Sequence, residues 1–205
     1  MFRNGMKLLI EMEKVGNVIG EAENGKEFLE LLETHKPDIV LMDIDMPIMN
    51  GIKATVEAIK RYPELKILAL SMFGDEKHYA KMINAGVKGF VLKKSGKHEL
   101  EKGIREVAKG ESYFSNELLR NIIINIGEHK ITKDVKTGLD FELNERELLV
   151  LKYISNGCST SEIADKLYLS IKTIESYRSK LLAKTGSKNA VTLIIFAIKH
   201  GLIKI

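Results

Sequence analysis

The chain of 205 residues has one cysteine and no apolar run as long as a membrane helix. Cys158 can form no internal disulfide and has no cysteine partner for a zinc site, which agrees with a reducing compartment. The longest apolar stretches, such as residues 190–198, fall short of the roughly 18 to 20 residues that cross a bilayer. Glu11 and Glu13 stand where a secretory signal needs an apolar core. We therefore expect a cytoplasmic protein without a membrane span.

Charge is divided unevenly along the chain. Residues 1–125 hold 19 basic and 19 acidic residues, whereas residues 126–205 hold 13 basic and 9 acidic ones. The whole net charge of +4 therefore lies in the C-terminal part. A small basic module behind a neutral one is typical of a nucleic-acid reader joined to a regulator. A basic solvated face explains the same charge about as often.

The first half of the chain alternates between helical and strand patterns. We expect helices over residues 3–14, 26–34, 53–61, 77–85 and 97–109, and strands over residues 17–21, 38–42, 66–70 and 89–92. This order predicts βα units with right-handed crossovers and a parallel sheet. Ligands bind such sheets at the carboxyl ends of the strands.

After residue 109 only helical patterns follow. A trailing helix is expected over residues 115–127, and residues 128–141 are polar and aperiodic, as in a linker. Four more helices are expected near residues 144–156, 160–167, 171–185 and 188–200. Their starts carry two capping boxes, Asn144 with Glu147 and Ser159 with Glu162, and two single caps, Ser170 and Ser187. Their stops are Gly157, Gly186 and Gly201.

Polar side chains follow three of the expected strands. Asp43, with Asp45 two residues later, follows the run DIVLM, while Ser71 and Lys93 follow the next two strands. A carboxylate, a hydroxyl and an ammonium group can form and hold an acyl phosphate, with Mg²⁺ bridging the remaining oxygens. Singly, each residue is explained better as a loop cap, a strand-end hydroxyl or a solvated charge than as a functional group. Their combination favours phosphoryl chemistry.

The segments PDIVLMDIDMPIMNGI, ALS and AGVKGFVLKK resemble the receiver domain of two-component response regulators. The resemblance implies a flavodoxin-like (CheY-like) α/β fold with a parallel sheet. It implies that Asp43 accepts phosphate from a sensor histidine kinase and that Lys93 contacts the phosphoryl group. It also implies that Ser71 and Phe90 change position together on phosphorylation.

One part of the receiver pattern is missing from the sequence. Receivers begin with a strand that ends in an acidic pair for Mg²⁺, and FRNGMKLL resembles the helix that follows this strand. We therefore expect either an N-terminally truncated receiver or a receiver in which another segment or chain fills the gap. In both cases Mg²⁺ keeps only Asp43 and the backbone of Asp45, so that phosphorylation is weak. A central strand of some five buried apolar residues would contribute roughly 7–15 kcal/mol.

An enzymatic alternative uses the same residues. Asp-x-Asp after a strand, followed by serine and lysine on later strands, also resembles haloacid-dehalogenase-type phosphatases. Those enzymes need further acidic metal ligands after the lysine, and KSGKHELEKGIREVAKG holds no such pair. No catalytic residue is therefore assigned. The five histidines do not cluster in the sequence, and none is assigned to a metal.

Residues 159–184 read as two capped helices joined by a short turn, with small Ala164 permitting a close helix crossing. The second helix is expected to turn Ile174, Tyr177 and Leu181 inward. Its outward face would hold Lys172, Glu175, Ser176 and Ser179, flanked by Arg178 and Lys180. Such a face suits a DNA major groove, although an ordinary solvated helix has the same pattern.

Residues Asn144–Ile203 resemble the LuxR-type DNA-binding module, an all-α domain of four helices. The resemblance implies base-edge contacts from Glu175, Ser176 and Ser179, and phosphate contacts from Lys172, Thr173, Arg178 and Lys180. The last helix, Asn189–Lys199, resembles the dimerisation helix of that family. This implies a homodimer on paired half-sites of double-stranded DNA.

The sequence is thus identified as a member of the response regulators of the NarL/FixJ type. We expect a receiver domain over residues 1–125, a linker over residues 126–141 and a LuxR-type helix-turn-helix domain over residues 142–205. The expected function is transcriptional control by phosphorylation of Asp43. The alternative in the same class is a phosphorylation-independent transcription factor with a degenerate receiver.

Overall fold

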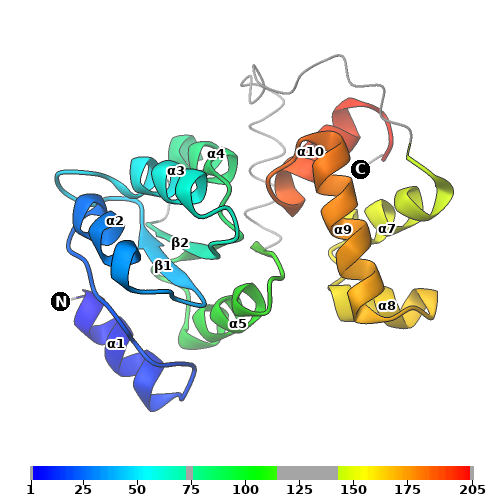
Figure 1. Cartoon of the computed structure of the whole chain (residues 1–205). Helices are drawn as coiled ribbons and strands as arrows, with labels where there is room; N and C mark the ends of the chain where they lie inside the picture. The colour runs from blue at the N-terminus through cyan, green and yellow to red at the C-terminus, as the bar shows by residue number, and fades with distance from the viewer. Residues whose placement is uncertain (1, 73–75, 115–142, 204–205) are drawn as a thin grey trace. The chain divides into compact units, whose positions relative to one another are not determined.

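The computed structural model describes residues 2–72, 76–114 and 143–203. The chain divides into two compact units, Met1–Leu119 and Arg120–Ile205 (Figure 1). Each unit has its own core. The helix expected over residues 115–127 and the linker expected over residues 126–141 lie outside the described residues.

A four-stranded parallel sheet in the order β1-β2-β3-β4 forms the centre of the first unit, as predicted. Its strands are β1 (Val40–Asp43), β2 (Ile67–Ser71), β3 (Gly89–Leu92) and β4 (Tyr113–Phe114). Every residue of β2 is buried, because this strand has neighbours on both edges and helices over both faces. The register places Asp43 beside Leu70 and Ser71 beside Leu92, so three strands end at nearly the same level.

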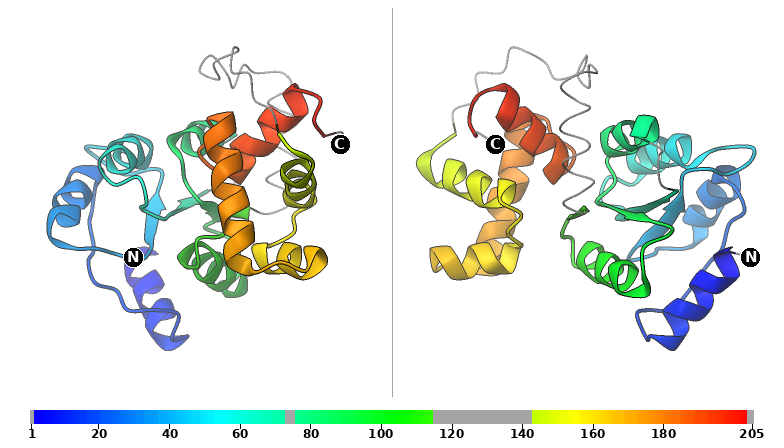
Figure 2. Two further views of the ribbon diagram at one scale, coloured as in Figure 1. Left: turned by 45° about the vertical axis from the view of Figure 1, so that its right-hand side comes forward. Right: turned by 180° about the vertical axis from the view of Figure 1, so that it is seen from behind.

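Helices cover both faces of the sheet (Figures 1 and 2). One face carries α1 (Phe2–Met12) and α5 (Lys97–Ala108), and the other carries α2 (Gly25–Thr34), α3 (Gly51–Arg61) and α4 (Glu76–Ala85). Leu68, Leu70 and Val91 of the sheet pack with Leu100, Ile104 and Val107 of α5, and Met6, Leu9 and Ile10 of α1 join this cluster. Side chains alternate between the two faces along each strand, so Leu68 and Leu70 both face α5 while Ala69 between them faces the opposite side of the sheet.

The strand expected over residues 17–21 is wrong, because these residues form no strand in the structure. The segment NVIGE has β-type composition, but a strand needs a ladder partner, and the described strands pair only with one another in the order β1-β2-β3-β4. Ile19 is 51% exposed, so the apolar residues that suggested the strand are only partly buried.

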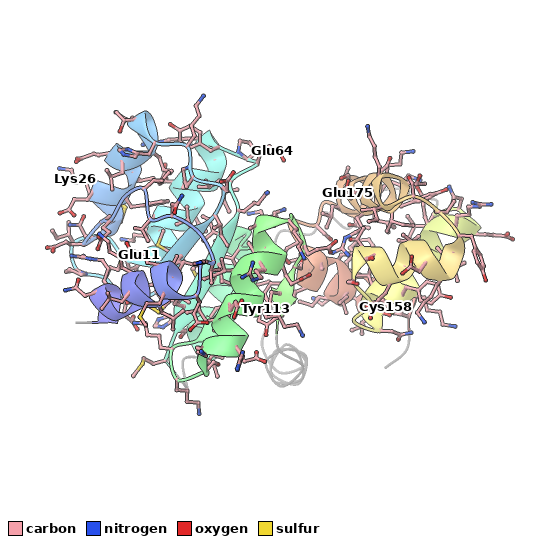
Figure 3. All side chains as sticks on the ribbon, turned by 90° about the horizontal axis from the view of Figure 1, so that it is seen from below. Glu11, Lys26, Glu64, Tyr113, Cys158 and Glu175 are labelled. Atoms are coloured by element: carbon pink, nitrogen blue, oxygen red, sulfur yellow. The ribbon has the colours of Figure 1, made fainter. Side chains whose placement is uncertain are left out.

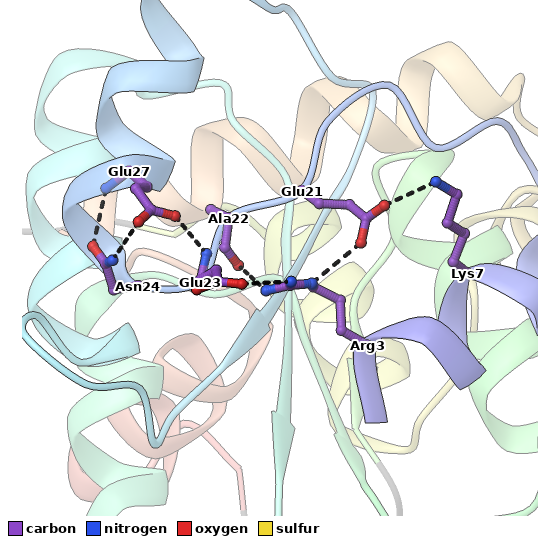
Figure 4. A network of polar contacts seen from close by, with 7 residues as sticks. All are labelled: Arg3, Lys7, Glu21, Ala22, Glu23, Asn24 and Glu27. Carbon is purple, nitrogen blue, oxygen red and sulfur yellow. Dashed lines mark hydrogen bonds and ion pairs between the residues drawn. The ribbon is translucent and has the colours of Figure 1, made fainter. Parts of the chain in front are cut away.

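Ion pairs instead connect the segment before α2 to α1 (Figure 4). Arg3 lies 3.2 Å from the Glu21 carboxylate and 3.0 Å from the Glu23 carboxylate, and Lys7 lies 2.9 Å from Glu21. Asn24 then caps α2 by accepting the backbone N–H groups of Lys26 and Glu27. The segment is held by side-chain contacts to a helix rather than by a backbone ladder.

The short strand β4 did not emerge from the sequence, which showed only helical patterns after residue 109. Its two residues pair with β3, Tyr113 beside Gly89 and Phe114 beside Phe90. Gly89 permits this close packing, because a Cβ there would lie 2.9 Å from the Tyr113 carbonyl oxygen and 2.8 Å from a Leu68 methyl group. Two residues are too few to show a period of two in a sequence.

In the second unit, described over residues 143–203, the four expected helices form: α7 (Glu145–Ser155), α8 (Thr160–Leu167), α9 (Ile171–Thr185) and α10 (Ala190–Lys199). They enclose a core of side chains from every helix: Leu151, Ile154, Ile163, Ala164, Ile174, Leu181, Leu193 and Ala197. Both predicted capping boxes form, and Ser170 caps α9. Gly157, Gly186 and Gly201 follow helix ends with φ of 78°, 64° and 67°, as predicted from their type.

One predicted cap is wrong. Asn189, not Ser187, caps α10: its side chain accepts the N–H of Thr192 at 2.9 Å, and the Thr192 hydroxyl accepts the N–H of Asn189 at 3.1 Å. The Ser187 hydroxyl lies 2.8 Å from that of Thr185. Ser187 and Asn189 both precede the apolar run of α10. The helix begins after Asn189 because Thr192, three residues later, completes a capping box with it.

Judged by length and hydropathy, none of the individual helices in the described ranges could span a membrane. Only α9 and α10 taken as a pair, bent by 56° at the break between them, reach that length and composition.

Candidate functional sites

The first candidate site lies at the carboxyl end of β1. Asp43 is its last residue, and the Nζ atom of Lys93 lies 2.5 Å from Asp43 Oδ2, although fifty residues separate the two in the sequence. The backbone N–H of Asp45 donates to Asp43 Oδ1 at 3.2 Å. The side chain of Asp43 is 29% exposed and that of Lys93 is 15% exposed. The carboxylate is thus held in an ordered position and is still reachable from solvent.

Ser71 and Phe90 lie one strand apart beneath this pair and are both almost fully buried. The Ser71 hydroxyl donates to the Met72 carbonyl at 3.1 Å, and the Ser71 carbonyl accepts the N–H of Lys93 at 2.7 Å. The Phe90 and Tyr79 rings pack edge to face, with centroids 4.8 Å apart. The Tyr79 hydroxyl also donates to the Met72 carbonyl, at 3.3 Å. Ser71 and Phe90 are therefore connected through Tyr79 and one shared carbonyl oxygen.

Tyr79 was not among the predicted site residues. It is 5% exposed and lies on α4, where the sequence indicated only a helix. The available signal was a single aromatic residue on the buried side of that helix. The periodicity of apolar residues predicts that a helix buries one face, but it does not predict which strand residue an aromatic ring on that face will contact.

The loop after Asp43 passes unusually close to the site. A Cβ on Gly51 would lie 2.0 Å from the Asp43 carbonyl oxygen, so no other residue fits there without a backbone shift. The Gly51 N–H donates to the Ile44 carbonyl at 2.9 Å, and Asn50 caps α3 directly beside it. At the tip of the loop, Ile48 has a φ of 63° and is 84% exposed. This conformation is uncommon for a β-branched residue.

The oxygen ligands at the site do not fit a tight Mg²⁺ centre. One oxygen of Asp43 already meets Lys93 and the other meets the N–H of Asp45. Across the described residues, no three His, Cys, Asp or Glu side chains come together as a metal site. Mg²⁺ requires near-octahedral oxygen coordination, and one shared carboxylate supplies little of it.

The second candidate site is the outer face of α9. Lys172, Glu175, Ser176, Ser179 and Lys180 are exposed, while Thr173 and Arg178 are half-buried. Ile174 and Leu181 are completely buried and Tyr177 is half-buried against the same core. Glu175 can be followed on α9 in Figure 3, and Cys158 lies in the turn before α8. The inward and outward faces of α9 are those predicted from the sequence.

The start of α9 is tightly defined. Tyr168 ends α8 with a φ of 54°, its N–H donates to the Ala164 carbonyl, and the turn places Ser170 as the cap of α9. The Ser170 hydroxyl accepts the N–H of Thr173 at 3.1 Å and lies 2.8 Å from the Thr173 hydroxyl. This cap holds the first turn of the helix that carries the candidate DNA contacts.

An ion pair that the sequence did not reveal connects α9 to α7. Lys184 Nζ lies 2.7 Å from Glu147 Oε2, and Glu147 is only 2% exposed. Burial acts to raise the pKa of Glu147, but the bonds from Lys184 and from the Asn144 backbone outweigh it and hold that pKa below its ordinary value. The capping box was the visible signal for Glu147, whereas nothing local pointed to Lys184.

Comparison with known families identifies both parts of the chain. The response regulator receiver domain matches residues 1–105, and the bacterial regulatory proteins of the luxR family match residues 142–197. The chain belongs to the response regulators that join a receiver domain to a LuxR-type DNA-binding domain. It is a DNA-binding regulator of the two-component class, as predicted. This family of transcription regulators favours that role over the phosphatase alternative.

Individual relatives match almost end to end. The chain is 31% identical to the transcriptional regulatory protein DegU of Brevibacillus brevis over 216 residues, which cover 100% of this chain and 92% of the relative. It is 32% identical to the oxygen regulatory protein NreC of Staphylococcus haemolyticus over 203 residues, with coverage of 98% and 94%. The RcsB response regulator of Salmonella typhimurium has a similar fold, with a TM-score of 0.55, 24% identity and coverage of 96% and 92%.

Proposed function

We propose that phosphorylation of Asp43 by a sensor histidine kinase controls DNA binding by this chain. The observation that carries the proposal is the 2.5 Å contact between Lys93 Nζ and Asp43 Oδ2 at the open end of the sheet. An Asp43 oxygen would attack the phosphorus of a phosphohistidine, the P–N bond would break, and the imidazole would leave. The Lys93 ammonium group is already in place to neutralise a phosphoryl oxygen.

The contacts among Ser71, Tyr79 and Phe90 would transmit a conformational change from Asp43 to α4. A phosphoryl group on Asp43 offers the Ser71 hydroxyl a charged acceptor in place of the Met72 carbonyl, and hydrogen bonds to charged acceptors are the stronger ones. When Ser71 turns toward Asp43, the Tyr79 hydroxyl stays on the Met72 carbonyl. Tyr79 and the Phe90 ring packed on it are then the side chains that adjust.

Phosphotransfer to the whole chain tests this proposal. A phosphorylated kinase, or a small donor such as acetyl phosphate in Mg²⁺, is incubated with the wild type and with Asp43→Asn, and intact mass reports the bound phosphoryl group. We expect slow labelling of the wild type, because the metal ligands are few, and none of Asp43→Asn. Labelling of Asp43→Asn at the wild-type rate would overturn the assignment.

The poor fit to Mg²⁺ favours a second candidate, a transcription factor that binds DNA without phosphorylation. In that case the first unit acts as a dimerisation or ligand platform. Asp43→Ala separates the two candidates: unchanged DNA binding and gene control favour the second, whereas loss of the response to phosphodonor favours the first.

We also propose that α9 is the recognition helix. Its exposed Glu175, Ser176 and Ser179 would meet base edges, and Lys172, Thr173, Arg178 and Lys180 would meet phosphates, with α10 pairing two copies on half-sites. Lys180→Glu should weaken binding to every sequence and lower its salt dependence, whereas Glu175→Ala should change sequence preference. Lys152→Glu, at an exposed position of α7, is the charge-matched control. Equal losses from Lys152→Glu and Lys180→Glu would contradict the proposal.

A further inference from the structure

An exposed apolar side chain stands at the beginning of α9. Ile171 is the first residue of the helix and is 53% exposed, whereas Ile174, three residues later, is completely buried. A half-exposed isoleucine contributes little to the core. Its β-branched side chain is also a weaker helix former than most alternatives. Stability of the fold therefore gives little reason for this residue at this position.

Ile171 is aligned with the proposed base-reading side chains. Ile171, Glu175 and Ser179 follow one another at intervals of four residues, so they form one row along the helix, and all three are exposed. The row begins at the N-terminal end of the helix, and this end of a recognition helix contacts base edges. The Ser170 cap fixes the backbone of this first turn.

The major groove offers only one apolar group to such a side chain. Its other groups are hydrogen-bond donors and acceptors, which isoleucine cannot satisfy, whereas thymine presents its 5-methyl group. We propose that Ile171 contacts the 5-methyl group of a thymine next to the position met by Glu175, and that it selects thymine over cytosine there. The proposal rests on the proposed role of α9 as the recognition helix.

Uracil substitution tests this contact atom by atom. The full-length wild type first selects a preferred duplex from random DNA, and each thymine in it is then replaced singly by deoxyuridine. Deoxyuridine pairs with adenine as thymine does and lacks only the methyl group. We expect the wild type to lose about four-fold in affinity at one position, which corresponds to one buried methyl group. Ile171→Ala should show no loss at that position.

Two further variants serve as a graded test and as a control for the Ile171 contact. Ile171→Val retains part of the apolar contact and should keep part of the deoxyuridine effect. Ile48→Ala changes an isoleucine that is 84% exposed in the first unit and should keep the whole effect. Thermal melts of each variant confirm that α9 is folded.

The outcomes distinguish the Ile171 contact from the recognition role of α9. If Ile171→Ala keeps the wild-type sensitivity at every thymine, or if no thymine is sensitive in the wild type, the contact is refuted while the role of α9 stands. If the wild type selects no sequence at all, the recognition role of α9 fails with it.

Discussion

The two units of this chain are specified over different distances along the sequence. In the helix-turn-helix unit, the helix starts are set by residues three apart, such as Asn144 with Glu147 and Ser159 with Glu162. In the receiver, Asp43 meets Lys93 across fifty residues, and Lys66 donates to the Ala108 carbonyl at the end of α5 across forty-two. The helix caps are therefore determined by neighbouring residues, whereas the receiver contacts form only once the sheet has formed.

Both units nevertheless have a non-glycine residue with a positive φ next to the candidate site. Ile48, in the loop after Asp43, and Tyr168, in the turn before α9, have left-handed backbones with φ of 63° and 54° and are mostly exposed. Such a conformation costs a non-glycine residue about 1–2 kcal/mol. In each unit a strained turn next to the site is supported by the ordered elements around it.

The sharpest test of the non-local unit is Gly51→Ala. The new Cβ would lie 2.0 Å from the Asp43 carbonyl oxygen, so the loop must shift. We expect a loss of about 3 kcal/mol in the free energy of unfolding of the receiver, together with impaired labelling of Asp43. Gly5→Ala in α1, where a Cβ meets nothing within 4 Å, is the matched control and should stabilise slightly. Equal effects of the two changes would show that the loop is not constrained as described.

The long-range contact inside the helical unit provides the next test. Lys184→Met leaves the buried Glu147 carboxylate without its ammonium partner and should cost about 2 kcal/mol. This is less than for a fully buried pair, because the Lys184 side chain is 38% exposed. Lys109→Met, which breaks the exposed pair with Glu106, should change stability little. Chemical denaturation of the full chain measures both.

The pH dependence of the same pair has a definite sign. Because the pKa of Glu147 is lowered in the folded state, the pair stabilises fully above the ordinary carboxyl pKa. That stabilisation is lost as the pH falls through the lower pKa of the folded form. The difference in unfolding free energy between wild type and Lys184→Met should therefore shrink on acidification. A difference that grows toward acid pH would contradict this assignment.

The corrected cap of α10 predicts a smaller effect. Asn189→Ala removes the acceptor of the Thr192 N–H and should cost about 1 kcal/mol. Ser187→Ala, at the position that the sequence suggested, should cost much less. The reverse order of the two losses, measured by thermal unfolding, would restore Ser187 as the cap.

The smallest expected effects concern the two strained turns. Ile48→Gly and Tyr168→Gly should each stabilise their unit by about 0.5–1 kcal/mol, because glycine adopts a positive φ without steric cost and little burial is lost. Ile48→Ala and Tyr168→Ala keep a Cβ and should show no such gain. If the alanine and glycine variants are equally stable, strain is absent from these turns.

The sequence was most informative where the determinants of structure are close together. The four C-terminal helices, both capping boxes and the inward and outward faces of α9 agree with the structure. The identities of Asp43, Ser71 and Lys93 as strand-end groups were also evident from the chain. The segment at residues 17–21 was misjudged for the opposite reason, since its composition suits a strand and only a neighbouring ladder can make it one.

By itself, the amino-acid sequence determined the described helices, most of their caps and the strands β1 to β3 with the helices between them, because apolar periods and capping partners lie within about four residues. Only the tertiary structure decided that Lys93 reaches Asp43, that Tyr79 joins Phe90 to the Met72 carbonyl, that Gly51 must be a glycine and that Lys184 neutralises Glu147. These contacts join residues from different elements, so their geometry is set by how strands and helices pack and is not encoded in any short segment.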